Sequence, residues 1–356
     1  MKVAFIGLLE SGKSTIFASL SGKAIAPIGS TAIQEATVPV PDERLDWLTE
    51  LYKPKKTTCA TIDCLDLPGF SFADEHSRAG ARRLINKIRT VDLLAVVVRA
   101  FENPAVPHYR GGIDPARDLA ELQTELLLAD LELVTTRIEK LEKQVHKPTK
   151  DHAHDKAELA LQQRLQEAIE SEKPVGSAIQ SDAEREMVKS LGFLTLKPVV
   201  VAVNIGEDQL DKKFDFAEIM GESARTFAIC GKLEYELSQL DADSRAEFIA
   251  DLGITESANT KFVHSCYSAL GLISFLTVVS GELRGWPIKQ GTTALDAAGK
   301  VHTDIKRGFI RAETFSFDEL KEFGSEKALK AAGKIRLEGK DYIVQDGDII
   351  NFRFNV

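Results

Sequence analysis

The sequence Gly7-Leu-Leu-Glu-Ser-Gly-Lys-Ser14 fits the pattern G-x-x-x-x-G-K-S/T. It follows the apolar run Lys2–Ile6, which predicts a buried strand, and it precedes a segment that predicts the first turns of a helix. In this setting the glycines allow backbone N–H groups to face phosphate oxygens, and the helix N-terminus adds a favourable field. We therefore expect a nucleotide-binding loop between the first strand and the first helix.

Each residue of this loop has an expected place beside the nucleotide. Lys13 is expected to reach the β- and γ-phosphates, and Ser14 to ligate Mg²⁺. Glu10 brings a negative charge near the phosphates, so we expect its side chain to point outward. The predicted nucleotide contacts in this stretch are Gly7, Leu8, Leu9, Glu10, Ser11, Gly12, Lys13, Ser14 and Thr15.

Composition narrows the class of protein. The chain has 356 residues, which suggests two or three domains, and 44% hydrophobic with 28% charged residues is typical of a globular protein. A net charge of −9 argues against a global electrostatic grip on nucleic acid. We expect no sequence-specific DNA binding.

Targeting signals and cysteine spacing indicate a reduced compartment. No apolar run approaches the roughly 18 residues that span a bilayer, and no signal peptide is evident at the N-terminus. The four cysteines lack metal-site spacing, because Cys59 and Cys64 are five residues apart. We therefore expect a cytoplasmic protein that does not associate with membranes.

Strand-like and helix-like segments alternate along the first third of the chain, and further strand-like segments follow it. Ala60–Asp66 alternates with period two and meets a Pro-Gly turn, whereas two later segments are continuous apolar runs typical of buried parallel strands. This order predicts a doubly wound α/β domain. The further strands are expected at Asp92–Arg99, Pro198–Asn204 and Thr226–Cys230.

A heptad pattern occupies Asp118–Val145 and is followed by a second helical stretch up to Ile169. A short polar break separates the two, so we predict a helical hairpin projecting from the α/β domain. The alternative is that both helices pack directly on the sheet. Beyond Arg284, Gly-rich turns separate predicted strands at Gly308–Phe315, Lys340–Val344 and Asp346–Val356, with a helix at Ser325–Ala332.

Two further motifs narrow the chemistry. Asp66-Leu-Pro-Gly69 fits D-x-x-G at the end of a strand, where Asp66 can hold Mg²⁺ through water and Gly69 can sense the γ-phosphate. Asn204-Ile-Gly-Glu207 follows another strand, where GTPases carry N-K-x-D to read guanine. The longer Glu207 side chain is expected to weaken guanine selectivity. We add Ile205, Cys230 and Gly231 to the expected base site.

Several longer stretches resemble the YchF family of Obg-like ATPases over essentially the whole chain. The resemblance implies a P-loop GTPase-like doubly wound sheet with a helical coiled-coil insertion and a C-terminal TGS domain of β-grasp type. The P-loop NTPase domain is expected to contain residues 1–117 and 193–280. The helical coiled-coil insertion is expected at 118–192 and the TGS-like β-grasp domain at 281–356. The stretches that carry the resemblance include Val38–Asp46, Val97–Asn103, Phe193–Pro198, Ala297–Asp304, Gly308–Ala312, Gly339–Val344 and Asn351–Val356.

The resemblance also implies slow, Mg²⁺-dependent hydrolysis of ATP, as a conformational switch, and association with ribosomes. Phe70 stands where Ras-like enzymes place a water-orienting Gln, and the family is thought to use a histidine from a mobile loop instead. The pattern Pro107-His-Tyr-Arg-Gly assigns that role to His108, beside Lys13 and Gly69 as catalytic residues. Thr31 or its neighbour Ser30 would supply the first-switch hydroxyl to the metal.

The departures from the family pattern are concentrated in the active site. The family's phosphate loop reads G-L-P-N-V-G-K-S, whereas Leu9, Glu10 and Ser11 stand at its variable positions here. The segment after Gly69 has fewer glycines than in the family. Two alternatives therefore stay open: a nucleotide-binding module with little or no turnover, and a GTPase.

Overall fold

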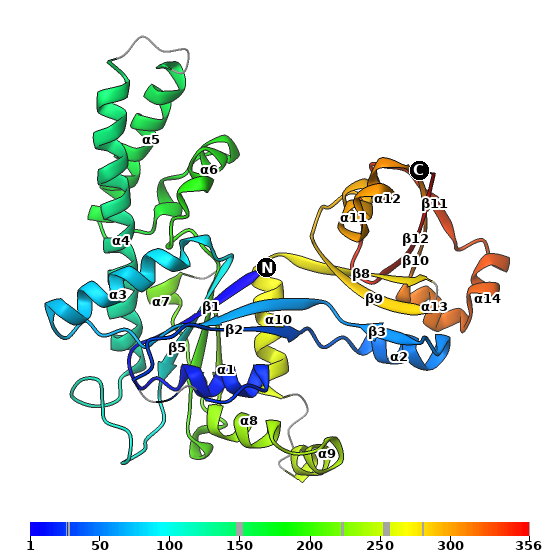
Figure 1. Ribbon diagram of the computed structural model, residues 1–356, viewed down its shortest axis with the longest axis horizontal. Coiled ribbons are helices and arrows are strands. Elements are labelled where there is room, and N and C mark those ends of the chain that lie inside the picture. Colours follow the sequence, from blue (N-terminus) through cyan, green and yellow to red (C-terminus); the bar gives the residue numbers. More distant parts are fainter. Residues whose placement is uncertain are drawn as a thin grey trace. The chain divides into compact units, whose positions relative to one another are not determined.

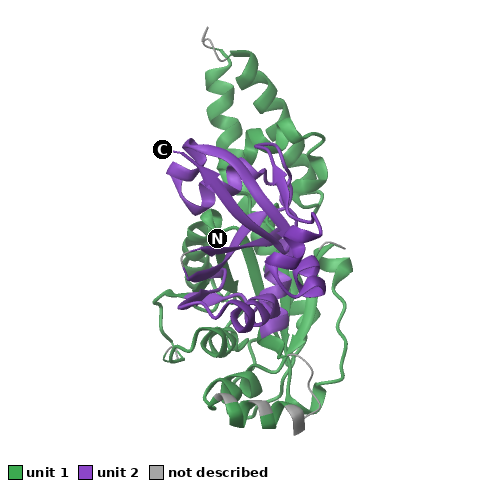
Figure 2. Ribbon diagram, turned by 90° about the vertical axis from the view of Figure 1, so that its right-hand side faces the viewer, with its two compact units in different colours: residues 1–36, 63–259 green, residues 37–62, 260–356 purple. Residues whose placement is uncertain are grey.

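The computed structural model describes residues 1–355 except 26, 28, 147–151, 222–223, 252–256 and 280. Backbone contacts divide the chain into two compact units, coloured in Figure 2. The first unit contains residues 1–36 and 63–259, and the second contains 37–62 and 260–356. The three-part division expected from the sequence remains a prediction.

The first unit is built on a six-stranded sheet in which the strand carrying the phosphate loop is central. Strand β1 (Lys2–Ile6) pairs in parallel with β4 (Thr61–Asp66) on one side and β5 (Leu93–Arg99) on the other. Parallel pairing continues from β5 to β6 (Val199–Asn204) and then to β7 (Arg225–Ile229). The full order is β2-β4-β1-β5-β6-β7, with β2 at Gln34–Pro39.

Helices cover both faces of this sheet. Successive side chains of β1 point to opposite faces and therefore pack against different helices. Phe5 meets Phe17 of the first helix edge-on at a centroid distance of 5.9 Å. Its neighbours Ala4 and Ile6 belong to a core cluster with buried residues of the helices that follow β4 and β5. The helices of this unit around the sheet include α1 (Lys13–Ser21), α3 (Glu75–Lys87), α4 (Pro115–Gln144), α7 (Ala217–Met220), α8 (Gly231–Ser238) and α9 (Ala242–Asp251).

The expected helical hairpin is present and extends away from the sheet of its unit (Figure 1). It consists of α4 and α5 (His152–Glu170), followed by the short helix α6 (Asp182–Val188). Its core is separate from the sheet core and is made by the apolar seam, including Val134, Leu141 and Leu165, all fully buried. The tip of the hairpin lies outside the described residues.

The second unit is also built on a six-stranded sheet, with the order β11-β10-β12-β8-β9-β3. Its strands are β3 (Lys56–Thr58), β8 (Leu272–Val279), β9 (Glu282–Lys289), β10 (Phe309–Ser316), β11 (Arg336–Glu338) and β12 (Asp348–Phe354). Its helices are α2 (Glu43–Tyr52), α11 (Ala294–Val301), α12 (Thr303–Arg307), α13 (Phe317–Phe323), α14 (Glu326–Ala331) and most of α10 (Ala258–Ala269).

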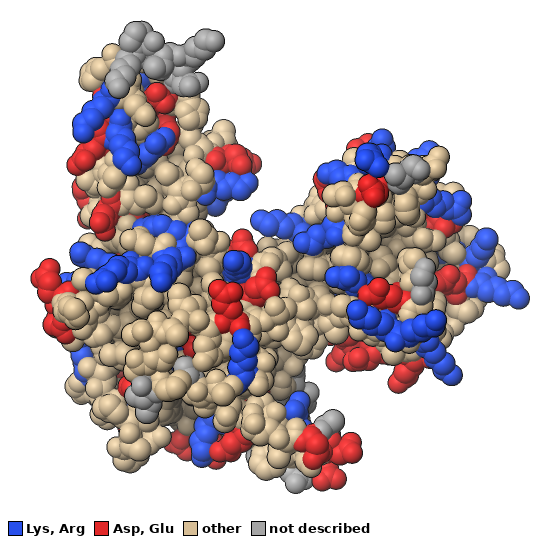
Figure 3. Space-filling view, in the orientation of Figure 1, with Lys and Arg blue, Asp and Glu red and all other residues tan. Residues whose placement is uncertain are grey.

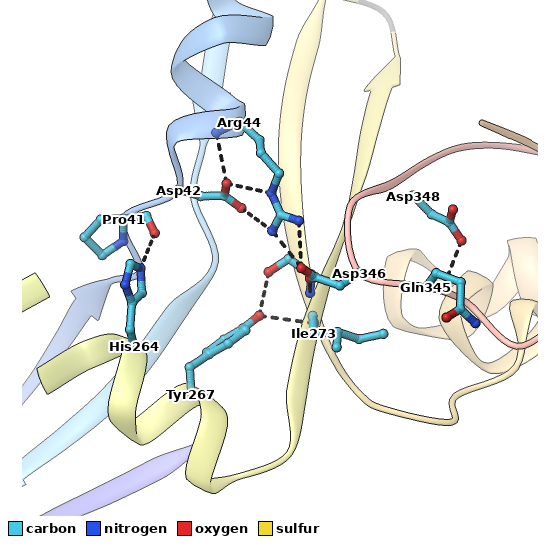
Figure 4. A network of polar contacts seen from close by, with 10 residues as sticks. Pro41, Asp42, Arg44, His264, Tyr267, Ile273, Gln345, Asp346 and Asp348 are labelled. Atoms are coloured by element: carbon cyan, nitrogen blue, oxygen red, sulfur yellow. Dashed lines mark hydrogen bonds and ion pairs between the residues drawn. The ribbon is translucent and has the colours of Figure 1, made fainter. Parts of the chain in front are cut away.

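A polar network explains why residues 37–62 belong to this second unit (Figure 4). The Arg44 guanidinium donates to Asp42 and to Asp346, with N–O distances of 2.8 Å to each. The Asp346 carboxylate also accepts from the backbone N–H of Ser274, whose hydroxyl lies 2.7 Å from the Tyr267 hydroxyl. The network thereby joins three segments that are far apart in the sequence, at residues 42–44, 267–274 and 346.

The prediction of a strand at Lys340–Val344 was wrong. Only Ile343 forms an isolated bridge, to Thr293. The backbone carbonyls of Tyr342 and Lys340 instead accept from the N–H groups of Ala294 and Leu295. These are first-turn donors of α11 that have no partner within their own helix, so the segment serves a helix end rather than a sheet.

Two further features concern the helices and the surface charges of the protein. Among the helices that the structure describes, none is long and apolar enough to cross a membrane. Basic and acidic side chains are interspersed over the face shown in Figure 3, so neither charge dominates that face.

Candidate nucleotide-binding site

The phosphate loop runs from the end of β1 into α1, as the sequence predicts. Gly12 caps α1 with a left-handed φ of +80°, and a Cβ atom there would lie 2.1 Å from the Asn204 side-chain nitrogen. Only glycine fits this position, because both the backbone conformation and the space exclude a side chain. The close approach brings the end of β6 against the phosphate loop.

Asn204 joins the phosphate loop to the segment after β7. Its side-chain N–H donates to the Ser11 carbonyl at 3.0 Å, and its side-chain oxygen accepts from the Gly231 N–H at 3.0 Å. The side chain is 4% exposed, so both hydrogen bonds are shielded from water. Asn204 therefore positions the two loops, with its side-chain nitrogen and its side-chain oxygen each engaged in one hydrogen bond.

A cavity of about 330 Å³, the phosphate cavity, lies along the phosphate loop. Lys13 and Asp66 line it from the loop and from the end of β4, and Gly69 lies at its edge, where a Cβ atom would be 2.9 Å from the Leu9 Cα. The predicted site residues that line this cavity are Leu9, Glu10, Ser11, Gly12, Lys13, Ser14, Thr15, Thr31, Asp66 and Gly69.

Burial shifts the two opposite charges of this cavity. Lys13 is 7% exposed, and burial lowers the pKa of its ammonium group although Asp66 and Glu10 favour the charged form. Burial likewise raises the pKa of the Asp66 carboxyl, opposed by the charge of Lys13 and a hydrogen bond with Ser14. Each group is held in a poorly solvated place that an opposite charge would stabilise.

The Asp66 and Ser14 side chains suit a hydrated Mg²⁺ ion. The Asp66 Oδ1 atom is buried and has no hydrogen-bond partner within the described structure. Oxygen ligands are those that Mg²⁺ prefers, and the ion usually keeps several waters. Among the described residues no cluster of three or more His, Cys, Asp or Glu side chains could hold a metal by itself. The donor set therefore fits an ion that is completed by phosphate oxygens.

A second cavity of about 600 Å³, the base cavity, adjoins the phosphate loop at Glu10, Gly12 and Thr15. Its walls include the predicted base residues Asn204, Ile205, Glu207 and Cys230. Glu207 is largely exposed, and its carboxylate accepts from the Lys232 ammonium at 2.9 Å. The group expected to read the base is therefore already paired with a cation.

The segment after Gly69 packs directly on the phosphate loop. The Phe70 N–H donates to the Gly7 carbonyl, and the Phe70 carbonyl accepts from the Leu9 N–H, both at 2.9 Å. The Phe70 side chain is fully buried. One backbone donor of the loop is thus bonded to this segment instead of facing the cavity.

His108 lies apart from the phosphate cavity. It is exposed and lines a narrow recess with Leu9 and Ser11, on the side of the loop that faces the β5–α4 connection. Gly7, Leu8 and Gly231 also line neither of the two cavities, although they belong to the loops that frame them. The remaining predicted residues line one or both of the two adjoining cavities of the first unit.

Comparison with known sequences gives matches at both ends of the chain. Residues 2–137 match the family described as "50S ribosome-binding GTPase", and residues 272–355 match the YchF-GTPase C-terminal family, described as "Protein of unknown function (DUF933)". The ribosome-binding ATPase YchF of Bacillus subtilis is 36% identical over the full length of both chains. The chain belongs to the YchF family.

Other members of the YchF family agree in sequence and in fold. Obg-like ATPase 1 of Oryza sativa subsp. japonica is 38% identical over the whole chain and 92% of its own length. The structure of the Schizosaccharomyces pombe YchF GTPase covers 99% of this chain at 30% identity, with a TM-score of 0.84, and 97% of its own chain is covered. The expected fold class is thereby confirmed, and the chain is a P-loop NTPase.

Sequence reasoning missed some residues of this YchF-type site. Phe101, Lys232 and Tyr235 line the base cavity. The ion pair between Lys232 and Glu207 determines whether the Glu207 carboxylate is available to a base. Lys232 follows the predicted strand end at Cys230, but no spacing rule links a lysine there to a glutamate 25 residues earlier. Phe101 falls within Val97–Asn103, a stretch that carries the family resemblance, but its place beside Gly12 is set by the fold.

Proposed function

We propose that the protein binds ATP with Mg²⁺ and hydrolyses it slowly as a conformational switch. The observation that carries the proposal is the convergence of Lys13, Ser14, Asp66 and Gly69 around the phosphate cavity. These residues supply a phosphate-binding cation, two oxygens suited to the metal and a backbone N–H near the position of a γ-phosphate. Thr31 lines the same cavity and could add a hydroxyl ligand.

ATP is favoured over GTP because of Glu207. A guanine base presents two adjacent N–H donors, which an aspartate in N-K-x-D accepts, whereas adenine lacks that pair. The Glu207 carboxylate is paired with Lys232, so using it for guanine would require breaking that contact. GTP remains the second candidate, since an ion pair this exposed to water stabilises the closed contact only weakly.

His108 is proposed to orient the attacking water. Phe70 occupies the place of the Ras-type Gln and cannot polarise water, so another group is needed. His108 is exposed on a loop beside the phosphate loop, and a movement of that loop would be required to bring its imidazole to the γ-phosphate. This requirement is consistent with slow turnover, and without such a movement the protein would be a nucleotide-binding module.

We further propose that the ribosome is the partner. The support is the printed description of relatives as ribosome-binding ATPases and of the family matched by residues 2–137. The chain's net charge of −9 indicates that such binding would use local surfaces and not its overall field. Ribosome binding would place the protein in the cytoplasm.

The first experiment measures competition of ATP and GTP for one site by titrating a fluorescent ATP analogue, with Mg²⁺. We expect ATP to compete more strongly, and Lys13→Ala to weaken binding about 100-fold, because a charged hydrogen bond to phosphate is lost. Lys189→Ala is the matched control, since Lys189 is exposed and pairs with Glu186 on the hairpin side of the unit. Binding and hydrolysis by Lys13→Ala equal to those of the parent would refute the proposal.

Hydrolysis is tested separately by single-turnover assays with and without ribosomes. We expect slow turnover that falls at least tenfold in His108→Ala, within the range of a general acid–base or positioning group. Turnover that is unchanged by this substitution would remove His108 from the mechanism. No turnover in either assay would favour the pure binding module.

A further inference from the structure

Both backbone polar groups of Phe72 are held by the two residues that follow His108. The Phe72 N–H donates to the Tyr109 hydroxyl at 2.8 Å, and the Phe72 carbonyl accepts from the Arg110 guanidinium at 3.3 Å. The Phe72 side chain is 2% exposed and packs beside Phe70, with ring centroids 6.2 Å apart. The segment after Gly69 is therefore fastened to the His108 loop by two specific hydrogen bonds.

Helix α4 anchors this connection. Glu121 accepts from the Tyr109 hydroxyl at 3.5 Å and pairs with Arg110 at 3.0 Å. One turn later, Glu125 pairs with Arg78, which also reaches the Phe72 carbonyl at 3.5 Å. Glu125 is 5% exposed, whereas the Arg78 side chain that pairs with it is 43% exposed.

The connection continues on both sides. On one side Phe70 pairs with the backbone of the phosphate loop through Gly7 and Leu9. On the other side the buried Arg99 guanidinium donates to the carbonyls of Val106 and Pro107, at 3.1 and 2.8 Å, and so fixes the chain just before His108. The phosphate loop is thus linked through residues 70–72 to the two residues after His108, and Arg99 separately holds the two residues before it.

We propose that Tyr109 and Arg110 are positioning residues that make the His108 loop move together with the segment after Gly69. A γ-phosphate that bonds the Gly69 N–H would shift residues 70–72, and the two hydrogen bonds to Phe72 would carry that shift to His108. Without them, the imidazole would have to find its place by independent loop motion. The inference rests on the proposed role of His108 in hydrolysis.

Hydrogen exchange tests the connection without reference to catalysis. Tyr109→Phe keeps the ring but removes the hydroxyl that accepts from Phe72, so the amides of residues 70–72 are expected to exchange at least about fivefold faster. Tyr267→Phe, which removes a hydrogen-bonded hydroxyl in the second unit, is the matched control and should leave these amides unchanged. Equal exchange in the parent and Tyr109→Phe would overturn the inference.

A double-mutant cycle tests whether Tyr109 acts through His108. In single-turnover assays, Tyr109→Phe is expected to lower the rate of hydrolysis about tenfold, as misplacement of a catalytic group does, while affinity for a non-hydrolysable ATP analogue stays within twofold. In the His108→Ala background the same substitution should have no further effect. An equal tenfold loss in both backgrounds would overturn the inference.

The two proposals fail in different ways. If His108→Ala hydrolyses ATP like the parent, the proposed role of His108 fails, and the exchange of residues 70–72 still decides whether the connection exists. If hydrolysis depends on His108 but Tyr109→Phe behaves like the parent in both measurements, the connection fails and the proposed function stands. Arg110→Gln removes the hydrogen bond of Arg110 to the Phe72 carbonyl and leaves that of Arg78, so it should change both measurements in the same direction as Tyr109→Phe.

Discussion

The phosphate cavity and the base cavity share the phosphate loop but are built from different kinds of groups. The charged groups of the phosphate cavity, Lys13 and Asp66, are 7% and 3% exposed, and glycines force the backbone into place around them. In the base cavity the side chains of Glu207 and Lys232 are 55% and 71% exposed. The first cavity is determined by burial and backbone geometry, the second by side chains at the surface.

This difference has an energetic meaning. Buried charged groups are costly to desolvate, so substitutions of Lys13 or Asp66 have large effects on the phosphate cavity. The exposed Lys232–Glu207 pair is screened by water and is easily broken, so the nucleotide preference of the base cavity can change by small steps. We expect substitutions in the phosphate cavity to act on binding as a whole and those in the base cavity to act on selectivity.

The largest expected effect is that of Asp66→Asn on the metal. If Asp66 holds Mg²⁺ through water, its loss should weaken Mg²⁺ binding to the nucleotide complex by about 10- to 100-fold. Titration of the nucleotide-bound protein with Mg²⁺ measures this. Asp63→Asn on the same strand is the matched control, because Asp63 is half exposed and pairs with the N-terminal amino group. Equal Mg²⁺ affinities in the two variants would remove Asp66 from the metal site.

Asp66→Asn should also make the folded protein more stable than the parent when nucleotide and Mg²⁺ are absent. Burial raises the pKa of the Asp66 carboxyl in the folded state, so this group binds more protons folded than unfolded and its ionisation destabilises the fold as pH rises through that pKa. At pH 7, Asp66→Asn should therefore unfold at a higher temperature than the parent. A lower unfolding temperature would show that the charge of Lys13 outweighs burial.

The next largest effect separates two glycines at the ends of α1. Gly12 and Gly22 both have a left-handed φ, +80° and +66°, but only a Cβ atom at Gly12 would meet other atoms. Gly12→Ala should therefore reduce the free energy of unfolding by about 1–3 kcal/mol more than Gly22→Ala, the difference being overpacking against Asn204. Denaturant unfolding of both variants measures it. Equal losses would mean that the loop can move away from Asn204.

A smaller effect is expected in the base cavity. Lys232→Ala frees the Glu207 carboxylate, which should raise the affinity for GTP relative to ATP by at most about fivefold, the range of an exposed ion pair. Competition binding with both nucleotides measures the ratio. Glu236→Gln is the control, since Glu236 lines the same cavity and lies 3.9 Å from the same ammonium but is not part of the motif Asn204–Glu207. A change of more than a hundredfold in this ratio would mean that the surface side chains of the base cavity act as strongly as the buried groups of the phosphate cavity.

The smallest effect concerns two cysteines. Burial raises the pKa of Cys64, two residues before Asp66, to about 12, whereas Cys230 lines the base cavity and burial raises its pKa as well. At pH 8, a maleimide should leave Cys64 unmodified and modify Cys230 slowly, and ATP should slow the reaction at Cys230 further. Mass spectrometry of peptides reports each site. Unchanged labelling of Cys230 with ATP would place the base elsewhere.

Much of the first unit was predictable because its signals are local. A short apolar run followed by Gly7–Ser14 specifies strand, loop and helix within about 20 residues, and the heptad spacing specifies two helices with one apolar stripe each. The strand expected at Lys340–Val344 failed for the opposite reason. Its backbone groups serve α11, about 45 residues earlier, and no local pattern contains that partner.

The amino-acid sequence alone determined the phosphate loop, the parallel strands that lead to the site and the helical hairpin, because each depends on spacing within a short stretch. Only the tertiary structure decided that Lys232 pairs with Glu207, that Asn204 joins two loops, and that Tyr109 and Arg110 hold Phe72. Those contacts join segments 25 to 193 residues apart. Their partners are chosen by how the strands and helices pack, which no single stretch of sequence specifies.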